Sequence, residues 1–554
     1  MSTILSLHDP ADAKRYYADG TWRHDTMYAL VRHHALTRPD GWALRDATRR
    51  LTWAQLRDWV IAVADDLHEA GVRRGQRVGV WLPNRVEAVV AFLACSRNGY
   101  VVTPSLHRNH TTAQIVQLMR RVSAAALIVQ PGYGADADRA DIFGEAKGLD
   151  SLRRIYSVDP PGPGGDAVAF PPQGTAPRRL IVMDRNPDKI VYLAFTSGTT
   201  GEPKGVMHSD NTLLANGRPM VADWQFGPDT VILSLSPMSH HIGTVAIEQM
   251  LACGGELVLD DPPPGKSRLD WIRESGATYV MGVPTHAIDV QAAMKRAGVA
   301  TLGAVKVFYM AGSPIPREVC RAFLQIGVTP QNIYGMTENG SHQYTLPSDD
   351  AETIVGTCGR ANAGYEVKIF AADDPHTEVP IGTVGQIGSR GGNLTLGYFA
   401  DQAVTENSFN AGGWFMSGDL GVLDARGCLT IVGRQKDLII RGGHNIHPAQ
   451  VEDVAISHPK IEKCAVFGIP DDRLGEKVCL AYIASDRREI PAEALLAHLD
   501  QAGLSRYDMP EFLIALPEFP LTPSGKILKR GLVDWVKTGK IAPTPVRFAQ
   551  KVSP

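Results

Sequence analysis

The chain has 554 residues, which is too long for one hydrophobic core and predicts at least two domains. Hydrophobic residues make up 44% of it, as in ordinary globular proteins, and the formal net charge of −3 excludes the strongly basic surface of a nucleic-acid or anionic-membrane binder. No apolar run is long enough to cross a bilayer.

The chain ends and the cysteines predict a cytoplasmic protein. Asp9 and Asp12 stand where a signal peptide would be basic, and the chain closes on Ser553 and Pro554 rather than on a peroxisomal tripeptide. The seven cysteines are scattered without CxxC spacing, so we expect reduced, mostly buried thiols and no zinc site.

Alternating helices and strands in the first four hundred residues predict a large α/β body. Residues 52–71 form an amphipathic pattern that Thr52 caps and Gly71 ends. The strand 78–82, the helix 85–98 and the strand 100–102 make a βαβ unit, which predicts a parallel sheet. Further strands are expected at 125–129, 190–195, 231–235 and 257–259, and surface loops at 160–177 and 261–265.

After Gly433 the predicted elements shorten. Strands near 464–468, 477–483 and 512–516 and a helix at 491–501 predict a small α+β domain of roughly a hundred residues. From Lys540 no periodicity remains, and we expect an extended tail. We therefore expect two domains, residues 1–434 and 435–554.

The segment 196–205, TSGTTGEPKG, directly follows a predicted strand and predicts a phosphate-binding loop. Glycines allow a tight turn with inward N–H groups, hydroxyls add donors and Lys204 adds a cation. It is not a Walker A loop, because Lys204 stands between Pro203 and Gly205. The hydroxyls and glycines are Thr196, Ser197, Thr199, Thr200, Gly198, Gly201 and Gly205.

Four later segments carry residue types suited to a nucleotide. They read YGMTE (334–338), GWFMSGDLG (413–421), GRQKDLIIRGG (433–443) and PLTPSGKILKR (520–530). An aromatic ring can stack on a purine, and one carboxylate together with phosphate oxygens is a normal way to hold Mg²⁺.

These five segments, in this order, resemble the motifs of the adenylate-forming acyl-CoA synthetases across almost the whole chain. The opening YYADGTW (16–22), with the HxxG and GGxNIxPxxVE segments, looks closest to the cyclohexanecarboxylate and aryl acid CoA ligases. The resemblance implies an α/β fold with a large multi-sheet N-terminal adenylation domain and a small, mobile α+β C-terminal domain.

The resemblance also implies a site for ATP, Mg²⁺ and coenzyme A. Lys526 is implied as the catalytic lysine, Lys436 as the hinge and Glu338 as the magnesium ligand, while Thr196 and His240 complete the catalytic set. The implied cofactor-binding residues are Ser197, Gly198, Thr199, Thr200, Gly201, Lys204, Gly312, Ser313, Tyr334, Gly335, Thr337, Asp419, Arg434, Gly442 and Gly443.

The implied acyl pocket contains no Asp, Glu, Lys or Arg and several small residues, which predicts a bulky, uncharged carbocyclic or aromatic acid. Its residues are His240, His241, Gly243, Gly282, Val283, Ala311, Gly312, Gly335 and Met336. His241 stands where amino-acid-activating relatives carry an aspartate, which argues against an amino acid substrate.

Three functions remain open from the sequence. The leading one is an ATP-dependent carboxylate–CoA ligase that forms an acyl-adenylate and pyrophosphate. The second is an adenylating enzyme that stops at acyl-AMP or passes the acyl group to a carrier protein, and the third is a nucleotide-binding protein without catalysis, which Lys526 and Glu338 weigh against. Two residues depart from the family pattern: Gln386 stands where the family usually has Glu, and His444 where many relatives have Glu. A homodimer is left open.

Overall fold

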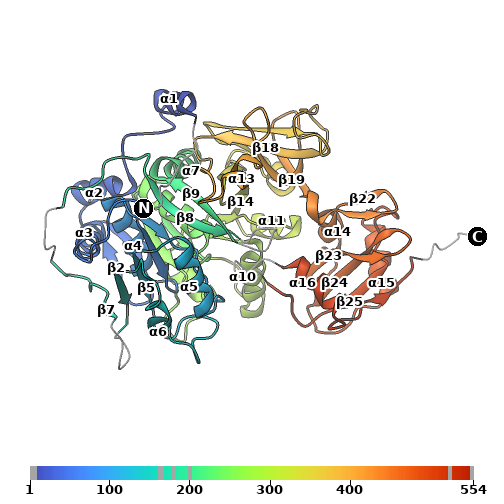
Figure 1. Cartoon of the computed structure of the whole chain (residues 1–554). Helices are drawn as coiled ribbons and strands as arrows, with labels where there is room; N and C mark the ends of the chain where they lie inside the picture. Colours follow the sequence, from blue (N-terminus) through green and yellow to red (C-terminus); the bar gives the residue numbers. More distant parts are fainter. Residues whose placement is uncertain (1–8, 160–166, 177–180, 197–202, 522–526, 549–554) are drawn as a thin grey trace, which may run out of the picture.

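A computed structural model describes residues 9–159, 167–176, 181–196, 203–521 and 527–548 of the chain (Figure 1). Its strands form four sheets, and the last sheet lies apart from the others at the C-terminal side of the molecule. The three earlier sheets use strands up to Arg434, and the last begins at Ile439.

The first sheet has the order β7-β6-β5-β3-β4-β8-β9. Strands β3 and β4 are parallel and flank the fully buried helix α4, so the predicted βαβ unit is confirmed. The strand bounds are β3 (Arg77–Trp81), β4 (Val101–Thr103), β5 (Ala126–Val129), β6 (Arg154–Ser157), β7 (Val168–Ala169), β8 (Ile190–Thr196) and β9 (Lys204–Ser209).

The second sheet has the order β16-β15-β14-β13-β12-β10-β11-β1-β2. Its central strands, from β11 through β10, β12 and β13 to β14, are parallel, and helices α8, α10 and α11 pack against them. The bounds are β1 (Trp42–Arg45), β2 (Arg50–Thr52), β10 (Val231–Ser234), β11 (Glu256–Leu259), β12 (Tyr279–Gly282), β13 (Val307–Met310), β14 (Thr329–Met336), β15 (Gly340–Tyr344) and β16 (Arg360–Ala361).

Two more sheets follow in the chain, the third fully antiparallel and the fourth mostly antiparallel. The third contains β17 (Tyr365–Phe370), β18 (Gly385–Gly391), β19 (Phe415–Leu423) and β20 (Leu429–Arg434). The fourth contains β21 (Ile439–Arg441), β22 (His444–Ile446), β23 (Ile461–Asp471), β24 (Gly475–Ala484), β25 (Phe512–Ala515) and β26 (Thr544–Pro545), with only β24 and β25 parallel.

Helix α3 starts where the sequence predicts a cap. Thr52 accepts a hydrogen bond from Gln55 N and closes a capping box at the start of α3, an arrangement worth about 1 kcal/mol. The bounds are α1 (Pro10–Asp19), α2 (Met27–Thr37), α3 (Trp53–Glu69), α4 (Val86–Asn98), α5 (Thr112–Arg121), α6 (Ile142–Ala146), α7 (Asp210–Asp223), α8 (His241–Cys253), α9 (Arg268–Glu274), α10 (Pro284–Ala297), α11 (Arg317–Gln325), α12 (Ala351–Gly356), α13 (Gln402–Glu406), the 3₁₀ turn η1 (Gln435–Asp437), α14 (Pro448–Ala455), α15 (Ala492–Gln501) and α16 (Lys529–Lys537).

Two sequence predictions are corrected. The stretch 160–177, expected to be loop, contains β7, which pairs with β6. The stretch after Lys540, expected to be an extended tail, contains β26, which pairs with β25. Both strands have two residues, too few to carry the alternation that marks a strand in a sequence, and each forms because a neighbouring strand offers a free edge.

The apolar residues form separate cores, as expected for a chain of more than one domain. The largest apolar cluster packs α2, α3, α4 and α8 against the first two sheets, and a separate cluster fills the fourth sheet and its helices. The seven cysteines are all free, and five are buried. In the described part of the chain, no helix is long and apolar enough to cross a membrane.

Candidate active site

The carboxyl ends of four neighbouring parallel strands bring the predicted acyl-pocket segments together. Strands β10, β12, β13 and β14 lie side by side and parallel, so the residues that follow them meet at one edge of the sheet. Those residues include 236–244, 283–285, 311–313 and 337–338. Ligands bind at this edge in open α/β sheets, which gives the sequence motifs a common location.

The first sheet meets the second at the same place. His107, which follows β4, forms a hydrogen bond of 2.9 Å with the Ser239 hydroxyl, which follows β10. Phe195, near the end of β8, donates its N–H to Ser105 Oγ at 2.5 Å. The end of β8, where the predicted phosphate loop begins, therefore lies beside the edge that carries the acyl-pocket segments.

The predicted phosphate loop joins β8 to β9. Thr196 and Lys204 are the last paired residues of this antiparallel hairpin. The Lys204 ammonium lies 4.9 Å from the centre of the Tyr398 ring, a cation–π contact that fixes the position of the charge. Ser197, Gly198, Thr199, Thr200 and Gly201 lie outside the described residues.

Glu338 is a buried carboxyl close to that cation. The Tyr398 hydroxyl donates a hydrogen bond of 3.0 Å to Glu338 Oε1. Burial raises the pKa of Glu338, while backbone and Tyr398 hydrogen bonds and the charges of Lys204 and Arg434 oppose the rise. Such a carboxylate gains from a nearby cation, so its chemistry fits Mg²⁺ held jointly with phosphate oxygens. Within the described ranges, no cluster of three or more His, Cys, Asp and Glu side chains could hold a metal without such help.

Tyr334, Asp419 and Arg434 form a second polar group. The Tyr334 hydroxyl donates to Asp419 Oδ2 at 3.0 Å, and Arg434 Nε donates to Asp419 Oδ1 at 2.9 Å. The Asp419 carboxylate raises the pKa of Arg434, so the guanidinium stays charged. Each Asp419 oxygen keeps a second lone pair, so the carboxylate can accept two hydroxyl groups of a ribose.

Two glycines of the predicted cofactor set are required by the backbone. A Cβ at Gly335 would lie 1.8 Å from Gly340 O, which no side chain can do. Gly312 has a φ of 95°, a conformation that strongly favours glycine. Gly335 thus allows the close approach of the Gly340 backbone, and Gly312 allows a left-handed turn after β13.

The predicted acyl-pocket histidines have different surroundings. His240 is the N-cap of α8, and its Nδ1 accepts from Ile242 N at 3.3 Å. His241 is buried, and its Nδ1 forms a hydrogen bond of 3.2 Å with the Tyr192 hydroxyl. Burial lowers the pKa of His241 to about 3, so the ring is neutral at physiological pH.

Close packing explains two of the four glycines in the predicted acyl pocket. A Cβ at Gly243 would lie 2.6 Å from Pro237 O, and one at Gly282 would lie 2.9 Å from His286 Nδ1. Gly243 therefore lets the first turn of α8 approach the segment after β10.

The predicted hinge lies between the third and fourth sheets, and the predicted thiol-side stretch lies at the start of the fourth sheet. Lys436 is in η1, which joins β20 to β21. Gly442 and Gly443 have φ values of 58° and 85° in the turn that joins β21 to β22. His444 Nε2 lies 2.8 Å from Asp508 Oδ1. Lys526 lies outside the described residues.

Sequence reasoning missed several residues that shape the site. His208 Nε2 forms a hydrogen bond of 2.7 Å with Thr337 O, and its ring stacks on His241 at 5.8 Å between ring centres. Tyr398 and Tyr192 were also missed. Tyr398 ends the segment 384–398, in which the family pattern points only to Gln386. Tyr192 lies in an apolar run that predicts only a strand, and His208 lies in β9, for which the sequence predicts no strand.

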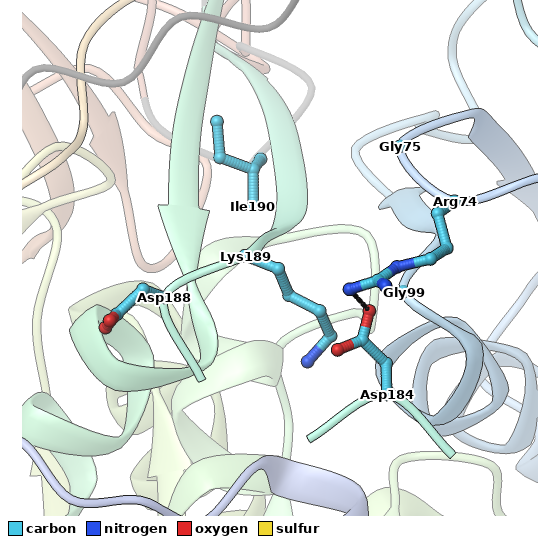
Figure 2. Close-up of a pocket in the computed structure, with 7 residues that line it drawn as sticks. All are labelled: Arg74, Gly75, Gly99, Asp184, Asp188, Lys189 and Ile190. Atoms are coloured by element: carbon cyan, nitrogen blue, oxygen red, sulfur yellow. Dashed lines mark ion pairs between the residues drawn. The ribbon is translucent and has the colours of Figure 1, made fainter. Parts of the chain in front are cut away.

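A separate cavity of about 240 Å³ lies at the opposite end of β8 (Figure 2). Ile190, the first residue of β8, lines it, whereas Thr196 is the last residue, about 20 Å away along the strand. Two of its charged residues are in ion pairs, Arg74 with Asp184 at 2.5 Å and Lys189 with Asp210. Asp188 accepts hydrogen bonds from the Tyr17 hydroxyl and from Asn211. This cavity contains none of the predicted site residues.

The chain belongs to the AMP-binding enzyme family. That family matches residues 31–399, and the AMP-binding enzyme C-terminal domain matches residues 450–526. The large α/β N-terminal region and the smaller C-terminal region are those of adenylate-forming enzymes, as the sequence predicts.

Relatives with known activities span almost the whole chain. A medium-chain fatty-acid–CoA ligase of Escherichia coli (strain K12) is 29% identical over 96% of this chain and 93% of its own length. A 2-succinylbenzoate–CoA ligase of Bacillus cereus is 28% identical over 93% of this chain and 99% of its own. Among solved structures, ATP-bound MatB from Rhodopseudomonas palustris superposes with a TM-score of 0.81, at 27% identity, over 92% of this chain and 99% of that one.

Proposed function

We propose that this protein is an ATP-dependent carboxylate–CoA ligase whose acid is bulky, uncharged, and carbocyclic or aromatic. The observation that carries the proposal is the arrangement of Tyr334, Asp419 and Glu338, with Lys204 close by, at the edge where the acyl-pocket segments meet. One site thus offers groups for ribose, for magnesium and for phosphate beside an uncharged pocket.

In the first half-reaction the substrate carboxylate attacks the α-phosphate of ATP, and the bond to the bridging oxygen of pyrophosphate breaks. Both reactants are anions, so cations in a sheltered site stabilise the transition state. Lys204 would meet the departing pyrophosphate, and Lys526 would meet the carboxylate and the α-phosphate. Bound Mg²⁺ would neutralise phosphate charge, with Glu338 as its protein ligand.

In the second half-reaction the thiol of coenzyme A attacks the acyl carbon, and AMP leaves. This step needs none of the pyrophosphate contacts. We propose a domain boundary at residues 434 and 435 and a rotation about Lys436 that withdraws Lys526 and brings residues 441–446 toward the thiol. The position of η1 between the third and fourth sheets supports this hinge.

The acid is inferred from the walls of the pocket. The segments after β10, β12, β13 and β14 contain no charged side chain among residues 240–244, 281–285, 311–313 and 335–336. A second charge on the acid would be buried without a partner, which is costly. Neutral His241 can exchange a single hydrogen bond with a ring substituent without demanding a charge.

A second candidate is an enzyme that delivers the acyl group to an acceptor other than coenzyme A. The His444 contact with Asp508 favours it, because His444 stands in the proposed thiol-side stretch where many relatives carry Glu. For either candidate we propose a cytoplasmic location, which the free cysteines support.

The test is ATP–pyrophosphate exchange with a panel of carboxylic acids, repeated with coenzyme A and mass analysis of the product. Acid-dependent exchange and an acyl-CoA support the proposal, and exchange without acyl-CoA supports the second candidate. Asp419→Asn should lose exchange, while Glu366→Gln is the matched control. Glu366 also pairs with an arginine, Arg390, at 3.0 Å, but on the exposed surface.

A further inference from the structure

A buried carboxyl in α8 has no role in the reaction described above. Glu248 has no exposed surface, and its Oε1 has no hydrogen-bond partner among the described residues. No lysine, arginine or histidine of the described residues pairs with it. A buried carboxyl without a cation is costly when ionised, so Glu248 is held as the neutral acid.

The other oxygen of Glu248 joins α8 to α7. Asn216 Nδ2 donates a hydrogen bond of 2.6 Å to Glu248 Oε2. The two helices touch here, because a Cβ at Gly217 would lie 2.7 Å from Glu248 Cβ. The contact is therefore fixed by backbone packing as well as by the hydrogen bond.

Asn216 in turn holds the turn between β14 and β15. Its Oδ1 accepts the Ser341 N–H at 2.7 Å. Gly340 has a φ of 61°, and a Cβ there would lie 2.6 Å from Asn216 Oδ1, so the turn presses against this side chain. The turn spans residues 336–340 and contains Thr337 and Glu338.

We propose that Glu248, as a neutral acid, is a positioning residue that orients Asn216 and thereby fixes the turn that presents Glu338 to magnesium and ATP. The proposal rests on the proposed function for the role of Glu338. It also links the acyl pocket to the nucleotide site, because Glu248 is on the helix that begins with His241.

The surroundings of Glu248 make its protonation state testable. Burial raises its pKa to about 8, and the Asn216 hydrogen bond opposes the rise. The titratable groups that face it are Tyr192 from β8 and Tyr309 from β13, both kept neutral by burial, which raises their pKa values. From α2, His34 reaches only the far end of α8, at Leu251 O, and Glu256 of β11 is paired with Arg50.

The experiment compares Glu248→Gln, Glu248→Met and wild type in ATP–pyrophosphate exchange and in calorimetric binding of Mg²⁺–ATP. Gln is neutral at every pH and preserves an acceptor for Asn216, so it should retain activity at neutral pH. Met has similar volume but leaves Asn216 Nδ2 unpartnered, so it should weaken Mg²⁺–ATP binding and exchange by about tenfold. Wild-type-like binding and exchange in a folded Glu248→Met protein would overturn the proposal.

The pH profile separates positioning from simple packing. Between the ordinary carboxyl pKa of 4.5 and about 8, folded Glu248 keeps a proton that the unfolded chain releases. Wild-type stability should therefore fall with rising pH in that window relative to Glu248→Gln. Above about pH 8 wild-type exchange should also fall relative to Glu248→Gln. Identical pH profiles of the two proteins overturn the proposal, even if Glu248→Met does not fold.

The matched control is Glu256→Gln. Glu256 is also a buried carboxyl, 3% exposed, but both its oxygens bind Arg50 at 2.7 Å. This variant should lose stability without a change in the pH profile or in Mg²⁺–ATP affinity. Calorimetry needs no acid substrate, so it tests the positioning even if no acid supports exchange and the proposed function fails.

Discussion

The hydroxyl of Tyr334, at the end of β14, lies 3.0 Å from Asp419 Oδ2 in β19, so this hydrogen bond joins the second and third sheets at the proposed nucleotide site. Arg434 holds the other oxygen of the same carboxylate. Both oxygens of Asp419 are thereby fixed in orientation, which would lower the entropy lost when the proposed ribose contact forms.

Asp419→Asn should therefore weaken ATP binding strongly, and Tyr334→Phe should weaken it less. The first removes the charge that attracts Arg434 and one acceptor for a ribose hydroxyl, while the second removes one hydrogen bond to a charged group. Such a bond is worth about 1.5–3 kcal/mol, so we expect KM for ATP to rise about tenfold or more in Tyr334→Phe. Equal KM values for both variants and wild type in the exchange assay contradict this role.

Lys526→Ala should stop adenylation and largely spare thiol transfer from supplied acyl-AMP. The lysine charge is needed only while the carboxylate approaches the α-phosphate, and loss of one such contact costs about a hundredfold or more. The two half-reactions are measured separately by pyrophosphate exchange and by acyl-CoA formation. Equal losses in both would refute the division of labour.

Lys436→Pro should retain adenylation and lose thioester formation. Proline fixes φ and resists the backbone rotation that a hinge needs. Lys436→Ala is the control, since it removes the charge but leaves the backbone free to rotate. If Lys436→Pro forms acyl-CoA at the wild-type rate, the hinge lies elsewhere.

Magnesium dependence should be pH-sensitive through Glu338. Its pKa is raised by burial, so as pH falls the carboxyl takes up a proton and competes with the metal. We expect the Mg²⁺ concentration for half-maximal exchange to rise at low pH in wild type. In Glu338→Gln this trend should vanish and activity should be low at every pH. If the trend persists in that variant, the pH dependence comes from a group other than Glu338.

His241→Ala should penalise an acid with a ring oxygen more than its deoxy analogue. The neutral imidazole can form one hydrogen bond with such a substituent, and loss of a specific hydrogen bond changes discrimination between the two acids. The measurement is kcat/KM for each acid of the pair in both proteins. An equal loss for both acids places His241 in a purely packing role.

The sequence predicted the elements that depend on local signals. The cap at Thr52 and the βαβ unit around α4 are both confirmed. Both could be predicted because each depends on residues that are close together in the sequence. The strands β7 and β26 were missed because two residues have no periodicity, and their pairing depends on distant neighbours.

Within the site, the sequence predicted residues that stand in short motifs, such as Tyr334, Glu338 and Asp419. It did not predict the contacts that orient them: Tyr398 with Glu338, His208 with Thr337 and Asn216 with Ser341. These partners are more than fifty residues apart in the chain. Only the fold brings them together, so no local pattern marks them.

The most direct test of the central claim is product analysis after incubation with ATP, Mg²⁺, coenzyme A and a ranked panel of acids. The panel contains benzoate, cyclohexanecarboxylate, larger polycyclic acids, straight-chain fatty acids and acetate. We predict AMP, pyrophosphate and an acyl-CoA, with the highest kcat/KM for a bulky uncharged ring acid. A clear preference for acetate or long straight chains contradicts the substrate assignment, and absence of acid-dependent pyrophosphate release across the panel contradicts the chemistry itself.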